Sequence, residues 1–193
     1  MNFENTAVSF KISKEIQDIL IAWIVLSLII SKAELDLMVV GFISVGTAFV
    51  CHELAHRYIA RRHYLHAEFK LWEKGLLLAA LLAIMTRGQF VFAAPGAVYI
   101  SGYYITNEIN GRISLAGPLV NLCFASIAIV AFVVHPSLLT STLAAINGYF
   151  ALFNLIPVPP LDGSKIRTWN KNIHTLAIVW ALILVILIEY LIF

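Results

Sequence analysis

Two histidines and a glutamate stand within five residues of one another in the segment HELAH. His52 and His56 are four residues apart, so on an α-helix they lie on one face, one turn apart. Two imidazoles placed in this way can bind one Zn²⁺, and the adjacent Glu53 can act as general base towards a water that the metal activates. A catalytic zinc site also needs a third protein ligand and an open fourth position. The segment therefore predicts two ligands and the base of a hydrolytic zinc centre.

The surroundings of HELAH favour this interpretation over a chance match, although the pattern fixes only three positions. No charged residue occurs from Leu37 to Cys51, so the motif comes at the end of an apolar helix. Ionisable residues in a membrane span are costly and usually functional. His56 lies five residues before Arg61, which is ~7–8 Å along a helix. We therefore expect the site inside the membrane, close to the face that the arginines mark.

A third ligand is expected in the segment FNLIPVPPLDGSK. Asp162 follows three prolines that must interrupt the helix, and an interrupted helix can direct a side chain into a cavity. Gly163 permits a tight turn directly after the carboxylate. Asn154, eight residues earlier, carries an amide that could donate to an oxyanion. The alternative is that Asp162 is an ordinary turn residue, since Leu-Asp-Gly is common in turns.

The composition predicts that these residues are held by membrane helices. Hydrophobic residues make up 61% of the 193 residues and charged residues 12%, whereas a soluble domain is nearer half apolar and a quarter charged. The net charge of +2 gives no indication of nucleic-acid binding. Five apolar segments approach the ~20 residues that a membrane-spanning helix needs: 16–31, 37–58, 113–134, 138–156 and 173–193.

The region between residues 62 and 112 is predicted to be mixed. It contains one shorter apolar run, LWEKGLLLAALLAIMT, and aromatic, β-favouring residues broken by glycine and proline at 89–109. AVSFKIS near the N-terminus and AEFKLW also alternate as strands do, and the Asn-Gly pair of EINGRI predicts a turn. We expect a short third helix, a small β element and a possible re-entrant loop. The fold class is therefore an all-α polytopic membrane protein, with about six transmembrane or partly inserted helices and a small β element between the two motifs.

The basic residues predict which membrane face holds the site. They cluster before residue 16, after the HELAH helix, around residue 112 and after the PPLDG segment, whereas the opposite ends carry only Lys32. The positive-inside rule then places the N-terminus and both motif-bearing ends in the cytosol. His52 and Asp162 should consequently meet near the cytosolic face.

Together the two segments resemble the motifs of the site-2 protease family, zinc metalloproteases that cut within membrane spans. HELAH and NLIPVPPLDG stand in the order of that family's HExxH and NxxPxPxLDG motifs, and the resemblance covers about 37–165, including AGPLVNL. It implies that His52, His56 and Asp162 bind one zinc ion per chain, that Glu53 is the catalytic base, and that Asn154 helps to hold the substrate or its oxyanion. We expect a single membrane-embedded domain over 1–193, with no cleaved signal peptide, PDZ insertion or appended regulatory domain.

The function expected is hydrolysis of a peptide bond within or near the transmembrane segment of a membrane-protein substrate, in regulated intramembrane proteolysis. The partners are that transmembrane helix and the lipid bilayer, and the location is the cell membrane, crossed several times. One rival is a metal transporter or sensor that uses the same ligands, which the uncharged outer halves of the spans disfavour. Another, a zinc protease with a soluble catalytic domain, lacks a segment large enough.

Two further residue groups leave alternatives open. Asn121 lies inside a span, where an amide needs a partner; it either supports the site or joins helices, and helix joining is the preferred interpretation. The strands at 89–109 either bind an unwound substrate by adding it as a further strand or form a structural layer, and the sequence favours neither.

Overall fold

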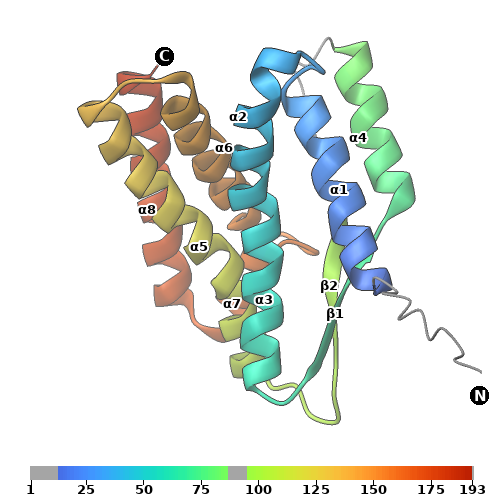
Figure 1. The fold of residues 1–193 in the computed structure, drawn as a ribbon. Helices are drawn as coiled ribbons and strands as arrows, with labels where there is room; N and C mark the ends of the chain where they lie inside the picture. The colour runs from blue at the N-terminus through green and yellow to red at the C-terminus, as the bar shows by residue number, and fades with distance from the viewer. Residues whose placement is uncertain (1–12, 87–94, 193) are drawn as a thin grey trace, which may run out of the picture.

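The computed structural model describes residues 13–86 and 95–192, which form a mostly helical fold with a two-stranded sheet (Figure 1). The elements follow in the order α1 (Lys14–Ile30), α2 (Leu35–Val45), η1 (Gly46–Val50), α3 (Cys51–Arg62), β1 (His66–Leu71), α4 (Glu73–Met85), β2 (Gly96–Ser101), α5 (Asn107–Val134), α6 (Leu138–Asn154), α7 (Asp162–Trp169) and α8 (Lys171–Leu191).

The segments α2, η1 and α3 run on as one helix of 28 residues, Leu35–Arg62. Its middle part, η1, is a π-helix, a local widening that is rare and often found at functional sites. Figure 1 shows this long helix between α1 and α4 on one side and α5, α6 and α8 on the other. HELAH is thereby central to the fold.

The largest hydrophobic core lies between α5, α6 and α8, with α7 closing its end. Small residues such as Ala125, Ala144 and Ala181 are fully buried there, which lets the helix backbones approach closely, as in membrane bundles. The outward faces of the same helices are apolar too, for example at Ile127, Val130 and Ile183. A helix that is apolar all round suits a lipid environment.

A second unit joins α1 to the sheet. The strands β1 and β2 pair antiparallel, with His66 opposite Ser101 and Leu71 opposite Gly96. On the far side of β1 two carboxylates of α1 accept backbone N–H groups: Glu15 from Phe69 and Asp18 from Leu71, each at 3.2 Å. The long helix is tied in as well, because Arg57 donates to Glu15 at 2.8 Å.

The structure confirms the mostly helical prediction and the small β element between the motifs, and it locates the strand AEFKLW in β1 and the short third helix in α4. About six membrane-inserted helices are not confirmed. Three helices in the described part of the chain are long and apolar enough to span a membrane, namely Leu35–Arg62, Asn107–Val134 and Lys171–Leu191. The strand AVSFKIS and residues 87–94 of the aromatic region lie outside the described residues, apart from Ser13.

The turn predicted at EINGRI is wrong, because these residues form the first turns of α5. Thr106 caps the helix there, since its hydroxyl accepts from the backbone N–H of Ile109. Gly111 of the Asn-Gly pair packs against Trp169 so closely that a methyl group would overlap it. Tertiary packing therefore outweighs the local turn preference.

Candidate metal centre and active site

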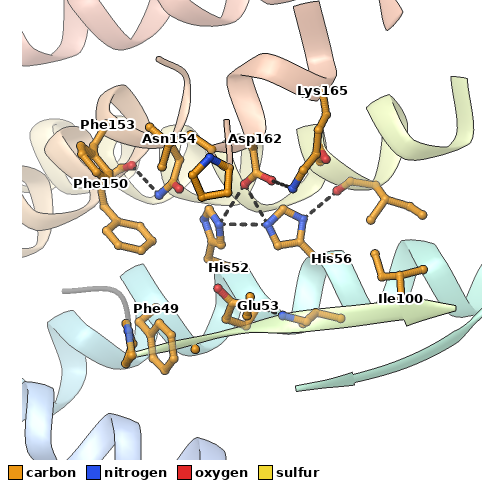
Figure 2. A pocket seen from close by; sticks show the side chains of 18 of the residues that line it. Phe49, His52, Glu53, His56, Ile100, Phe150, Phe153, Asn154, Asp162 and Lys165 are labelled. Carbon is orange, nitrogen blue, oxygen red and sulfur yellow. Dashed lines mark hydrogen bonds and ion pairs between the residues drawn. The ribbon is translucent and has the colours of Figure 1, made fainter. Parts of the chain in front are cut away.

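His52, His56 and Asp162 come together although more than a hundred residues separate the two motifs. The Nε2 atoms of the two histidines lie 3.0 Å apart. The Oδ2 atom of Asp162 is 3.4 Å from Nε2 of His52 and 3.0 Å from Nε2 of His56. All three residues are buried and form a group that could hold a metal ion. Figure 2 shows the three side chains pointing towards one another from α3 and α7.

The other ring nitrogen of each histidine has a protein partner. Nδ1 of His52 lies 2.5 Å from Oδ1 of Asn121, and Nδ1 of His56 lies 2.7 Å from the backbone oxygen of Ile113. A carbonyl oxygen only accepts, so each Nδ1 carries the proton. Each Nε2 is then left with a lone pair directed at the common point, which is the tautomer that a metal ligand needs.

A glycine leaves the space beside these nitrogens open. Gly117 of α5 faces them: a Cβ atom at this position would lie 2.5 Å from Nε2 of His56 and 2.6 Å from Nε2 of His52. Zn–N bonds are about 2.0–2.1 Å long, so a methyl group here would compete for the space of a bound metal. Two neutral imidazoles and a carboxylate around such a space are a donor set that fits Zn²⁺.

Asp162 is fixed by its place at the start of α7, where the helix dipole favours a negative charge. Gly163 packs onto the end of α6, where a methyl group would overlap the backbone oxygen of Leu155. Nζ of Lys165 lies 3.5 Å from the second oxygen, Oδ1.

The group borders a cavity of about 200 Å³ between α3, β2, α5, α6 and α7. Glu53 is buried and lines this cavity, and its Oε2 accepts from the backbone N–H of Val98 at 3.2 Å. Asn154 lines it too and donates one amide hydrogen to the backbone oxygen of Phe150. All five predicted site residues are thus at one place (Figure 2).

One edge of the sheet faces the same cavity. Since Phe69 and Leu71 direct their N–H groups to α1, and opposite pairs alternate along an antiparallel ladder, their partners Val98 and Gly96 must direct their own backbone groups away from β1. The contact from Val98 to Glu53 agrees with this. Gly96, Val98 and Ile100 line the cavity, so the outer edge of β2 borders the metal group.

The sequence prediction preferred a helix-joining role for Asn121 over a role at the site, and it did not include Asn147. Asn121 both contacts His52 and joins helices, since its Nδ2 donates to the backbone oxygen of Ala48 and to Oδ1 of Asn147. Both asparagines are fully buried. Asn147 belongs to no motif, but a lone amide in an apolar run is a signal that could have marked it.

A buried His–His–carboxylate group beside a glutamate is the arrangement of a zinc hydrolase. Similar proteins agree with this class. A protein of Methanocaldococcus jannaschii, named "Putative zinc metalloprotease MJ0611", is 36% identical over 187 residues, which is 93% of this chain and 94% of that protein. "Putative zinc metalloprotease Rip3" of Mycobacterium tuberculosis is 30% identical over 144 residues, 68% of this chain but only 32% of Rip3. No family model and no solved structure matches significantly.

The chain therefore belongs to the zinc metalloprotease family that these relatives represent, and the resemblance to the site-2 protease family is consistent with it. Zinc as the cofactor rests on the same two findings: the family is named for it, and the group of His52, His56 and Asp162 fits it.

Proposed function

We propose that this chain is an intramembrane zinc metalloendopeptidase, which hydrolyses a peptide bond within or near the transmembrane segment of a membrane-protein substrate. The observation that carries the proposal is the position of the metal group. His52 and His56 stand in a 28-residue helix that is apolar enough to span a membrane, and Asp162 reaches them from a separate element. A hydrolytic centre at that place is suited to substrates that are themselves in the membrane.

The orientation belongs to the proposal as well. The chain would be one domain that crosses the cell membrane several times, with the site near the cytosolic side. Arg61 and Arg62 at the end of α3 support this, as does Arg112 near the start of α5. Water would reach the site from the same side, and the product released there would enter the cytosol.

In the proposed chemistry, His52, His56 and Asp162 would hold the metal, the histidines with the Nε2 atoms that face the group. Zinc bound there would supply polarisation of the scissile carbonyl and activation of a water molecule. Glu53 takes the proton of the attacking water on its carboxylate and passes it to the nitrogen of the leaving amine. Asn154 donates its second amide hydrogen to the oxygen on which negative charge develops.

The sheet edge supports binding of the substrate as a strand. A transmembrane helix hides its amide groups in its own hydrogen bonds and must unwind before hydrolysis. The outer edge of β2 offers backbone groups at Gly96 and Ile100 on the side of the cavity, and an extended segment could pair with them. Since Glu53 is bonded to Val98 of the same edge, the base would lie close to the strand being cut.

The test is cleavage of a tagged single-span protein in detergent or vesicles, comparing wild type with Glu53→Gln and measuring zinc on both proteins. We expect one zinc per chain in both, cleavage by the wild type, and none by the variant. Cleavage by Glu53→Gln at the wild-type rate would remove Glu53 as the base. Zinc movement across vesicles by an uncleaving wild type would instead favour the transporter.

A further inference from the structure

His52 is held by side chains, whereas His56 is held by the backbone. Nδ1 of His56 donates to the backbone oxygen of Ile113, which every residue type provides. Nδ1 of His52 donates to an amide side chain, Asn121 of α5, at 2.5 Å. The orientation of His52 therefore depends on the identity of residues outside both motifs.

A chain of hydrogen bonds continues from Asn121 across three elements. Nδ2 of Asn121 donates to Oδ1 of Asn147 in α6 at 3.0 Å. Nδ2 of Asn147 donates in turn to Oγ1 of Thr47 in η1 at 3.0 Å, and Thr47 donates to the backbone oxygen of Ser44 at 2.9 Å. We call Asn121, Asn147 and Thr47 the amide relay.

Backbone carbonyls fix the direction of every bond in the amide relay. The oxygen and the nitrogen of an asparagine amide have nearly the same shape, so the hydrogen-bond partners must decide which atom is which. Asn147 must direct its N–H₂ to the backbone oxygen of Leu143, and Asn121 must direct its own to that of Ala48, because both oxygens only accept. Oδ1 of Asn121 is then left facing His52, which must donate to it.

We propose that Asn121 and Asn147 are positioning residues which, with Thr47, hold His52 as the Nδ1–H tautomer and direct its Nε2 to the metal. The proposal rests on the assignment of His52 as a zinc ligand in the proposed function. The bonds of Asn121 to His52, Ala48 and Asn147 lie away from water, since Asn121 and Asn147 are fully buried and His52 is 2% exposed, whereas the bond from Asn147 to Thr47 is partly buried. The amide relay also bonds to η1 at Thr47 and Ala48, which lie five and four residues before His52, and so fixes the helix from which His52 projects.

The experiment measures zinc affinity by competition with a chromogenic chelator on purified full-length protein, without substrate, together with thermal unfolding of the metal-free protein. Asn121→Leu removes the acceptor and should lower zinc affinity about 10–100-fold, as partners of metal-bound histidines do. Asn147→Leu leaves the bonds from Asn121 to His52 and Ala48 in place and should lower zinc affinity measurably, but less than Asn121→Leu does; an unchanged affinity would show that Asn147 does not position His52. Ser126→Ala, which removes a helix-joining bond with Trp180 that is not part of the relay, is the control and should leave it unchanged.

Asn121→Asp separates positioning from packing. It keeps an acceptor for Nδ1 of His52 but loses the donors to Ala48 and Asn147, so we expect lower thermal stability with zinc affinity closer to wild type than in Asn121→Leu. The proposal is overturned if Asn121→Leu folds and binds zinc like wild type, or if Asn121→Asp is no better than Asn121→Leu. A wild type that binds zinc but cleaves nothing would contradict the proposed function alone.

Discussion

Replacing Gly117 by alanine tests the metal centre most directly. The added Cβ atom would lie 2.5 Å from Nε2 of His56, so that imidazole would have to retreat by about 0.9 Å to reach 3.4 Å, where ordinary van der Waals contact begins. The imidazole of His52 would have to move by almost the same distance, because the Cβ atom would lie 2.6 Å from its Nε2. Neither ring is free to turn away, since each Nδ1 is anchored.

The expected loss can be estimated from that displacement. Loss of a group that merely orients a metal ligand costs about 10–100-fold in metal affinity, and here two of the three ligands are themselves displaced. We therefore expect Gly117→Ala to lower zinc affinity at least ~100-fold, or about 2.8 kcal/mol at 1.4 kcal/mol per tenfold. The helix itself should tolerate the change, because alanine is favoured over glycine within a helix by about 0.5–1 kcal/mol.

Gly148→Ala is the matched control for this prediction. Its Cβ atom would lie 2.6 Å from Cδ1 of Ile188, an equally close contact, but with the movable end of an apolar side chain that belongs to neither motif nor the amide relay. It should cost stability, by about 1–3 kcal/mol, and leave zinc affinity unchanged. Chelator competition and thermal unfolding on both variants decide the matter. Zinc binding by Gly117→Ala within tenfold of wild type would show that the metal does not occupy the space beside Gly117.

Three further outcomes are expected. Asp162→Asn should lower the zinc content after dialysis against a mild chelator, because a neutral amide is a poorer ligand than a carboxylate; a full wild-type content would exclude Asp162 as a ligand. Val98→Pro removes the backbone N–H that donates to Glu53 without removing a hydrogen bond to β1, so cleavage should fall about 10–100-fold, as for a hydrogen bond to a charged group. Zinc should be retained, and the control Val98→Ala should cleave at nearly the wild-type rate. Equal cleavage rates for Val98→Pro and wild type would show that the contact from β2 to Glu53 does not contribute to catalysis. Removal of zinc by phenanthroline should abolish cleavage, and added Zn²⁺ should restore it; activity that survives complete metal removal would contradict zinc catalysis.

The parts of the site that follow from local periodicity were predictable. Spacing four residues apart on a helix brings His52 and His56 together whatever the rest of the fold does. The position of Asp162 beside them could be predicted because the basic residues put the proline-interrupted end of the second motif at the same expected membrane face as HELAH, although the segment Leu-Asp-Gly by itself also suits an ordinary turn. Both predictions needed only local structure and the orientation rule.

The rest depends on contacts between elements that no local pattern encodes. Asn147 carries no motif, and its place in the relay arises only when α6 packs beside η1 and α5. The π-helical turn before HELAH is likewise unmarked in the sequence. The Asn-Gly pair at 110–111 shows the reverse error, since a strong local turn signal is overruled by packing against Trp169. The prediction of about six membrane-inserted helices also goes beyond the three in the described part of the chain that are long and apolar enough to span a membrane.

The two outer edges of the small sheet differ in which side chains accept their backbone N–H groups, and this difference bears on substrate binding independently of the metal. A two-stranded sheet alone is marginally stable, and an unpaired backbone N–H in an apolar environment costs several kcal/mol. On the edge of β1 this cost is avoided, because Glu15 and Asp18 of α1 accept the backbone N–H groups of Phe69 and Leu71. On the edge of β2 the acceptor is Glu53, the proposed base, and a cavity lies alongside. A substrate strand that adds to this edge, as proposed, would therefore lie beside the Val98–Glu53 contact, next to the group that is to act on it.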